Sequence, residues 1–269
     1  MDLLTRLNKK PILIAPGVFD ALTALLAERA GFEALYLSGA SISYSSLGLP
    51  DRAYTGLENV VHALGKIRQR TSLPIICDAD NGYGNEENVN FTVRILEQNG
   101  AAAIQLEDQV SPKRCGHLSG KEVVEPNEMV LKIKAAISAR KNALIIARTD
   151  ALAIEGVDSA IERAMLYTDA GADMIFIESP RNIEEVKRIG SEIKTLKMLN
   201  IVEGGKTPLI SAAKAEGMGY NLVIYPGSAI RIISKSVYEV FAELKSQGTT
   251  EGLLDRMFNF NELQKILET

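Results

Sequence analysis

The segment from Ser111 to Lys121 gathers several residues that could do chemistry in one short stretch. It contains Cys115, one of two cysteines, and His117, one of two histidines in the chain. Lys113, Arg114 and His117 are cationic or polarisable neighbours of the kind that lower the pKa of a thiol. A stretch rich in Gly, Lys and Arg is a poor place to bury a cysteine. The pattern predicts a reactive thiol in a loop, with a small packed residue as the alternative.

Carboxylates gather at the ends of apolar runs that precede this segment. Asp78 and Asp80 end one run, Glu107 ends another, and Asp51 follows Gly-Leu-Pro. If the strand period of two continues, Asp78 and Asp80 point to the same side. Four such carboxylates would suit Mg²⁺ or Mn²⁺, some of them through water. The alternative is that these acids cap helices or pair with surface Lys and Arg.

Arg148 also ends an apolar run, where a guanidinium needs an anion. Bidentate binding of a carboxylate is its strongest use. A salt bridge to Asp150 or Glu178 is the alternative. The small residues Ser38, Gly39 and Ala40 would let backbone N–H groups approach a substrate carboxylate, although a tight turn has the same composition.

These residues follow a repeating pattern of elements. Near-continuous apolar runs, typical of parallel strands buried on both faces, occupy residues 11–15, 34–37, 73–77, 102–106, 143–147, 173–177, 197–202 and 221–224. Helix-like stretches separate most of them, at residues 19–30, 56–70, 85–99, 126–140, 157–170 and 183–193. The alternation predicts an α/β fold, a (β/α)₈ TIM-type barrel with its site at the carboxyl ends of the strands. An open doubly wound sheet is the rival, but no Gly-x-Gly-x-x-Gly turn follows the first strand.

Length and composition restrict the function classes. We expect residues 1–269 to form a single domain, with 236–269 as terminal helices on the outside or against a partner. The net charge of −4 shows no basic block, so a nucleic-acid partner is not expected, and no apolar run approaches membrane-spanning length. Small molecules are the expected partners, and a cytoplasmic location is expected. Two cysteines and two histidines leave little room for a zinc site, so a metal would be bound by oxygen.

Taken together and in order, the motifs resemble the isocitrate lyase and phosphoenolpyruvate mutase superfamily. The resemblance runs from about Pro11 to the last helices. The matching motifs are Tyr36-Leu-Ser-Gly39, Ser46-Leu-Gly-Leu-Pro-Asp51, Asp78-Ala-Asp80, Glu107-Asp-Gln109, Lys113-Arg-Cys-Gly-His117, Ala147-Arg-Thr-Asp-Ala151 and Thr207-Pro208. The cysteine segment is the most specific of these and resembles the lyase branch, especially the methylisocitrate lyases.

The resemblance implies a reaction and a set of roles. Such lyases cleave a C–C bond of a 2-hydroxy di- or tricarboxylate, releasing a 2-oxo acid such as pyruvate and a carboxylate such as succinate. By similarity, Cys115 would be the general acid, with Lys113, Arg114 and His117 tuning it, and Tyr36 is our candidate to remove the hydroxyl proton. Asp78 would contact Mg²⁺ directly, and Asp51, Asp80 and Glu107 would hold its waters. The substrate site would comprise Tyr36, Ser38, Gly39, Ala40, Arg114, Gly116, Arg148, Glu178, Asn200 and Thr207.

The carbon skeleton of the substrate stays open at this stage. Leu118 and Gly204 stand where the nearest methylisocitrate lyases tend to have arginine and an aromatic residue, while Arg231 could bind a third carboxylate. A dimethylmalate lyase, an oxaloacetate hydrolase or decarboxylase, and a phosphonomutase are alternatives on the same scaffold. A metabolite-binding barrel, or a metal-free aldolase using Lys113 as a Schiff-base amine, belongs to a different class. The resemblance also implies a homotetramer in which terminal helices swap.

Overall fold

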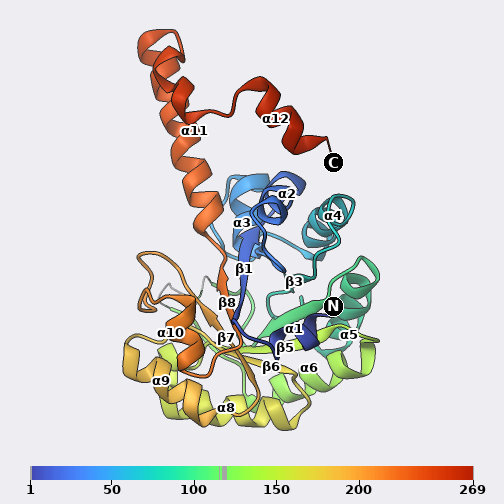
Figure 1. The fold of residues 1–269 in the computed structure, drawn as a ribbon. Coiled ribbons are helices and arrows are strands. Elements are labelled where there is room, and N and C mark those ends of the chain that lie inside the picture. The colour runs from blue at the N-terminus through green and yellow to red at the C-terminus, as the bar shows by residue number, and fades with distance from the viewer. Residues whose placement is uncertain (1, 115, 117–119, 269) are drawn as a thin grey trace.

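The chain folds into a closed barrel of parallel strands. The computed structural model describes residues 2–114, 116 and 120–268, and within them eight strands close in sequence order (Figure 1). The strands are β1 (Leu13–Val18), β2 (Leu35–Leu37), β3 (Ile75–Asp78), β4 (Ala103–Glu107), β5 (Leu144–Thr149), β6 (Met174–Ile177), β7 (Leu196–Asn200) and β8 (Leu222–Tyr225). Closure is made by β1 against β8, with Leu13 opposite Leu222 and Pro16 opposite Tyr225. The (β/α)₈ prediction is confirmed, and the open sheet is excluded.

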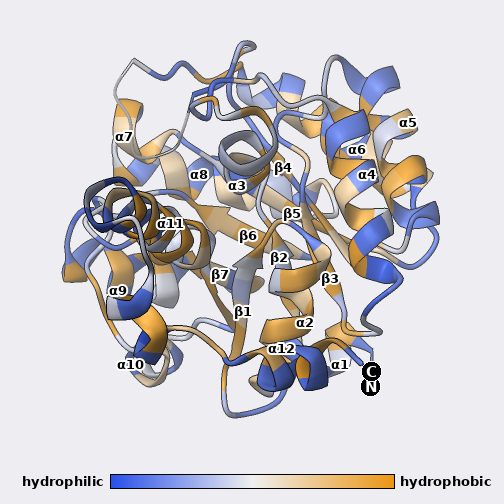
Figure 2. Ribbon diagram, turned by 90° about the horizontal axis from the view of Figure 1, so that it is seen from above, coloured by the Kyte–Doolittle hydropathy of each residue, from blue (hydrophilic) through white to orange (hydrophobic). Residues whose placement is uncertain are grey.

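Helices return the chain from each strand to the next and surround the barrel, as the view from above shows (Figure 2). The predicted helices are present as α2 (Ala21–Arg29), α4 (Leu57–Arg68), α5 (Glu86–Gln98), α6 (Pro126–Ala139), α8 (Val157–Asp169) and α9 (Ile183–Glu192). Shorter elements accompany them: α1 (Leu3–Leu7), α3 (Gly39–Ile42), the π-helical turn η1 (Ser43–Leu47), α7 (Leu152–Glu155) and α10 (Ala212–Gly217). Side-chain caps fix where several begin. Asn85, for example, accepts from the backbone N–H groups of Glu87 and Asn88 at the start of α5.

The core has two layers, one between strands and helices and one inside the barrel. Ile76, Ile146, Phe176 and Met198 fill the interior and are nearly inaccessible to solvent. Because side chains alternate along a strand, the residue two positions further on also faces inward, one layer nearer the carboxyl mouth. Those residues are polar: Asp78, Arg148, Glu178 and Asn200. The strands therefore end in a polar layer directly above an apolar one.

The terminal helices differ from their predicted bounds. Helix α11 (Ser228–Gln247) begins well before residue 236, directly after β8. The rest of the predicted terminal segment forms the 3₁₀ turn η2 (Glu251–Arg256) and α12 (Phe260–Leu267). Figure 1 shows α11 projecting from the barrel and α12 folding back, where it contacts α2. Among the described residues, no helix combines the length and apolar composition needed to cross a bilayer.

Barrel closure depends on a close approach at Gly17 of β1. A Cβ atom at this position would lie 2.2 Å from the carbonyl oxygen of Pro226, just beyond β8. Gly17→Ala should therefore destabilise the fold by about 1–3 kcal/mol through overpacking against backbone. Urea unfolding followed by circular dichroism measures the change. Gly65→Ala is the control, since this glycine on α4 has open space around it and alanine should stabilise the helix by about 0.5–1 kcal/mol. Equal stability of the two variants would contradict the role of Gly17.

Candidate active site

Polar residues from several strand ends meet at the carboxyl mouth of the barrel. Register places Glu107 of β4 beside Arg148 of β5, and Asp78 of β3 beside Gln105 of β4. The mouth of the barrel encloses a cavity of about 150 Å³. The predicted site residues that line it are Tyr36, Ser38, Ala40, Asp51, Asp78, Lys113, Gly116, Arg148, Glu178, Asn200 and Arg231. Residues far apart in the sequence are thus brought to one site.

Asp78 and Asp80 lie close together, but not because of strand periodicity. Strand β3 ends at Asp78, and the backbone of Asp80 has a φ of 47°. The Asp80 N–H donates to Asp78 Oδ1 at 3.2 Å. A Cβ at Gly39 would lie 3.3 Å from Asp78 Oδ2 and 3.6 Å from Asp80 Oδ1, so both carboxylates face this glycine. A left-handed non-glycine residue is strained, and such strain is typical of functional sites.

Lys113 reaches into this acidic group from its loop. Its Nζ lies 2.5 Å from Asp51 Oδ1 and 2.9 Å from Asp80 Oδ1, with the side chain 5% exposed. Burial alone would lower its pKa, but Asp80, Glu107 and the other carboxylates outweigh burial and raise the pKa well above the ordinary value. Lys113 is therefore a firmly charged ammonium. A Schiff-base amine must be neutral, so the pairing argues against the aldolase alternative.

The carboxylates do not form a ready-made set of direct metal ligands. In the part of the chain that the structure describes, no three His, Cys, Asp or Glu side chains are grouped to hold a metal ion. The reason is that protein cations occupy their oxygens: Lys113 pairs with Asp51 and Asp80, and Arg148 Nη1 lies 3.1 Å from Glu107 Oε2. The predicted arrangement, with one direct carboxylate and others acting through water, requires no such grouping, because Mg²⁺ keeps several of its waters.

Two observations show that the site suits a divalent cation. The buried atom Glu107 Oε1 has no hydrogen-bond partner among the residues that the structure describes. Burial raises the pKa of Glu107 well above its ordinary value and the pKa of Asp80 to about 6. A positive charge nearby would offset the cost of burying both carboxylates in their charged form. Asp51, Asp78, Asp80 and Glu107 therefore fit Mg²⁺ or Mn²⁺, and the oxygen-only donor set favours these hard ions.

Gln105 connects Tyr36 to the carboxylates and was missed by sequence reasoning. The Tyr36 hydroxyl donates to Gln105 Oε1 at 3.0 Å, and Gln105 Nε2 donates to Asp78 Oδ1 at 3.1 Å. Burial, followed by the charge of Asp78, raises the pKa of Tyr36 well above its ordinary value. The Tyr36 phenol therefore stays protonated at neutral pH and acts as a hydrogen-bond donor. These observations do not support the predicted role of Tyr36 as the base.

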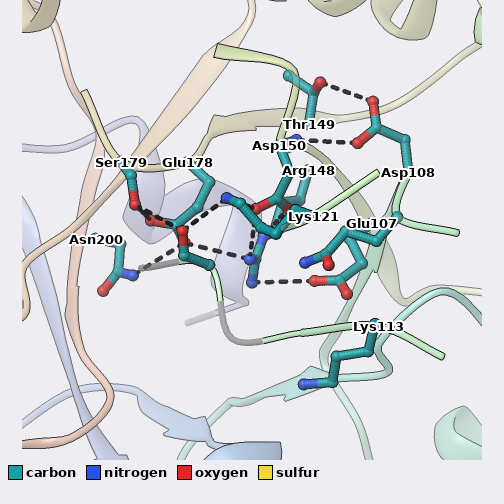
Figure 3. Close-up of polar contacts among 12 residues, drawn as sticks. Glu107, Asp108, Lys113, Lys121, Arg148, Thr149, Asp150, Glu178, Ser179 and Asn200 are labelled. Atoms are coloured by element: carbon teal, nitrogen blue, oxygen red, sulfur yellow. Dashed lines mark hydrogen bonds and ion pairs between the residues drawn. The ribbon is translucent and has the colours of Figure 1, made fainter. Parts of the chain in front are cut away.

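Arg148 is the central cation of the mouth (Figure 3). Its Nε and Nη2 donate to Asp150 at 2.8 and 3.1 Å, and Nη2 lies 3.5 Å from Glu178 Oε2. Its guanidinium carbon lies 5.3 Å from the centre of the Phe176 ring. Burial would lower the pKa of Arg148, but Asp150, Glu107 and Glu178 raise it well above the ordinary value. The salt-bridge alternative therefore holds, while the binding of a substrate carboxylate by Arg148, which also lines the cavity, stays a prediction.

Asn200 and Thr207 have side-chain oxygen atoms that are buried and unsatisfied among the described residues. Asn200 Nδ2 donates to Glu178 Oε2 at 3.1 Å. Asn200 Oδ1 and Thr207 Oγ1 are buried and have no partner within the described protein. Buried polar atoms in native proteins are nearly always satisfied, by water or ligand if not by protein. Asn200 lines the cavity, whereas Thr207 lies outside its lining.

Two other predicted site residues, Arg114 and Arg231, are less favourably placed to bind a substrate carboxylate. The Arg114 side chain is exposed and lies beside Gly120, where a Cβ would be 2.9 Å from its Nη1, so the structure does not place it against substrate. Arg231 lines the mouth, but its Nη1 donates to the Glu203 carbonyl at 2.5 Å and its side chain is 54% exposed. To reach a third carboxylate, Arg231 would have to leave Glu203. Cys115, His117 and Leu118 lie outside the described residues.

This barrel and mouth belong to a known family. A sequence profile described as phosphoenolpyruvate phosphomutase matches residues 4–245, and the chain is a member of the phosphoenolpyruvate mutase and isocitrate lyase superfamily, as the motifs predicted. It is 45% identical to 2,3-dimethylmalate lyase of Eubacterium barkeri, over 97% of this chain and 91% of that protein. It is also 45% identical to 2-methylisocitrate lyase of Aeropyrum pernix, over 97% of this chain and 84% of that protein.

Solved structures extend the likeness to other reactions. An oxaloacetate acetylhydrolase in complex with 3,3-difluorooxalacetate superposes with a TM-score of 0.92 at 33% identity, covering 98% of this chain and 91% of that one. A phosphonopyruvate hydrolase in complex with oxalate and Mg²⁺ superposes with a TM-score of 0.88 at 30% identity, covering 99% and 93%. The same barrel therefore carries lyases and hydrolases.

The raised pKa of Asp80 gives a pH signature for metal binding. Its pKa of about 6 exceeds the ordinary 3.8, so protonated Asp80 favours the folded state at low pH, and this contribution is lost as pH rises through about 6. Below that pH a bound cation must displace the proton, so we expect Mg²⁺ affinity to fall by roughly tenfold per pH unit. Thermal shift should show a larger gain in Tm from MgCl₂ at about pH 7.5 than at about pH 5. Sodium chloride at matched ionic strength is the control. An equal gain in Tm at both pH values would refute the coupling between Mg²⁺ binding and the protonation of Asp80.

Proposed function

We propose that this protein is a Mg²⁺-dependent lyase that cleaves a C–C bond of a 2-hydroxy di- or tricarboxylate of the 2,3-dimethylmalate or 2-methylisocitrate kind. The products would be a 2-oxo acid such as pyruvate and a carboxylate such as propionate or succinate. The observation that carries the proposal is the pairing, in one cavity, of the Arg148 guanidinium with the Asp51, Asp78 and Lys113 group. Arg148 would bind a substrate carboxylate, and the carboxylates of Asp51 and Asp78 would hold a divalent cation.

The residues at the mouth would divide the work of binding. Arg148, held by Asp150 and Glu178, would bind a substrate carboxylate in a fixed orientation. Asn200 would accept a further hydrogen bond through its Oδ1, which has no partner among the described residues. Bound Mg²⁺ would polarise the substrate hydroxyl and its neighbouring carboxylate. Lys113 would keep the acidic group compact while the substrate enters.

Cys115 would complete the reaction as a proton donor. Cleavage leaves the bonding electron pair on the carbon of the departing carboxylate, and the substrate hydroxyl becomes the carbonyl of the 2-oxo acid as its proton leaves. The thiol proton of Cys115 would then pass to that carbon. Gly116, its neighbour in the chain, lines the cavity, which supports this assignment.

Activity with a substrate panel tests the proposal. With Mg²⁺, the enzyme should release a 2-oxo acid from 2,3-dimethylmalate or 2-methylisocitrate, and Cys115→Ser should lower kcat by at least about a hundredfold because the general acid is lost. Cys77→Ser is the matched control: this thiol is buried within β3, burial raises its pKa, and activity should be retained. No turnover across the panel would contradict the proposal.

Hydrolysis of oxaloacetate is the second candidate, favoured by the close superposition on oxaloacetate acetylhydrolase. Product analysis by NMR separates the two. A lyase yields a 2-oxo acid from a 2-hydroxy acid, whereas the hydrolase would yield oxalate and acetate from oxaloacetate. Phosphonopyruvate belongs in the same panel, since a hydrolase of that compound has the same fold.

We also propose a homotetramer assembled through the terminal helices. Large apolar side chains on this part of the chain are exposed, including Tyr238 at 75%, Phe241 at 64% and Phe260 at 78%. An apolar surface of this extent is typical of a protein interface.

Light scattering after size exclusion tests the assembly. Phe241→Asp should shift the mass from tetramer to smaller species, because a charge would be buried at the interface without a partner. Phe91→Asp, at an exposed position on α5, is the control and should leave the mass unchanged. A monomeric wild-type protein would contradict the proposal.

A further inference from the structure

Lys121 is a buried lysine that the proposed reaction does not use. It lies at the end of the segment that contains Cys115, and its side chain is only 1% exposed. Its Nζ donates to Asp150 Oδ1 at 2.5 Å and to the carbonyl oxygen of Gly116 at 2.6 Å (Figure 3). A buried ammonium is stable only with such partners, so its location ties the loop to the barrel.

Gly116 fits the barrel closely at the point that Lys121 secures. A Cβ at Gly116 would lie 2.5 Å from Arg148 Nη2 and 2.7 Å from Glu178 Cγ. The Ser179 hydroxyl also donates to the Gly116 carbonyl, at 3.3 Å. The loop therefore lies directly against the two residues that would orient the substrate carboxylate.

Asp150 connects the loop to Arg148. One carboxylate oxygen accepts from Arg148 Nε, and the other accepts from both Arg148 Nη2 and Lys121 Nζ. Asp150 is itself fixed from behind, because its N–H donates to Asp108 Oδ1 at 2.9 Å. The other oxygen of Asp108 accepts from Thr149 and Tyr167. A single, firmly held carboxylate thus orients both the substrate-binding cation and the loop.

We propose that Lys121 is a positioning residue that latches the loop onto Asp150, so that Cys115 is delivered only over a correctly oriented Arg148. This rests on the proposed function for the role of Cys115. Lys121 touches neither substrate nor cation. Its contribution is the fraction of time in which Gly116, the chain neighbour of Cys115, lies against Arg148.

The arrangement predicts an unequal effect on the two kinetic constants. Removing Lys121 leaves the contacts between Asp150 and Arg148 in place, so substrate binding should persist. The seated loop loses two charge-assisted hydrogen bonds, which lowers its population by roughly tenfold to a hundredfold. Lys121→Met should therefore reduce kcat by about that factor, with KM within about threefold of wild type. Asp150→Asn should impair both constants, because it weakens Arg148 as well.

Trypsin supplies a readout that does not depend on turnover. The backbone of Arg114 is held by Gln109, whose side chain accepts from the Arg114 N–H at 3.0 Å and donates to its carbonyl at 2.9 Å. Release of Gly116 should expose the bond after Arg114, so this bond should be cleaved faster in Lys121→Met, as followed by mass spectrometry. The matched control is Lys197→Met. Lys197 is a buried lysine at the start of β7 whose Nζ donates only to backbone carbonyls, those of Ile193 and Thr195, among its described contacts.

Gly116→Ala is the second variant, and it leaves the Lys121 side chain in place. Its methyl group would collide with Arg148 and Glu178, so it should also lower kcat and speed cleavage after Arg114 even if Lys121→Met fails to fold. The proposed role of Lys121 would be overturned if either folded variant kept the wild-type kcat and the wild-type rate of trypsin cleavage after Arg114. A change in KM alone would overturn it as well. If no substrate is turned over by the wild type, the proposed function fails, while faster cleavage in both variants would still support a latch.

Discussion

Burial of negative charge is the constraint on which the mouth of this barrel depends. Asp51, Asp80, Glu107, Asp150 and Glu178 are all buried there, and a buried carboxylate needs a cation or donors close by. Lys113, Lys121 and Arg148 meet this need at contact distance. In the described part of the chain the acids still outnumber these cations, and the raised pKa values of Asp80 and Glu107 show where the imbalance falls. A divalent cation would correct the charge at the place where chemistry is proposed.

Strand alternation explains why this charge is tolerated in an otherwise apolar barrel. Ile76, Ile146, Phe176 and Met198 form a dry layer, and the next inward-facing residues are polar. The apolar layer fixes the strands, and the ion pairs among Arg148, Glu107 and Glu178 then hold the polar layer above it. The loop after β4 then covers this layer through Lys113 and Lys121. Both lysines reach from this loop into the buried mouth of the barrel.

The sequence predicted the barrel because apolar runs and helix-like stretches alternate clearly, and it predicted Asp78, Glu107 and Arg148 because they end such runs. The sequence could not predict which side chains these residues contact in the folded protein. Gln105 and Lys121 have no reactive pattern of their own, and their importance comes from neighbours distant in the sequence. The pairing of Lys113 with Asp51 is equally a product of the folded chain. The start of the terminal helices was misplaced because α11 follows β8 almost directly, and the apolar pattern did not show that boundary.

Strand ends and the loops around them contribute different side chains to the mouth. Arg148, Glu178 and Asn200 extend from strand ends, whose positions are fixed by the barrel. Arg231 instead lies in the first turns of α11, and its partner Glu203 belongs to the loop after β7. Loops and helix starts can change without moving the strands. Proteins named for dimethylmalate and oxaloacetate share this fold, so the fold alone does not fix the reaction, and the side chains at the mouth must do so.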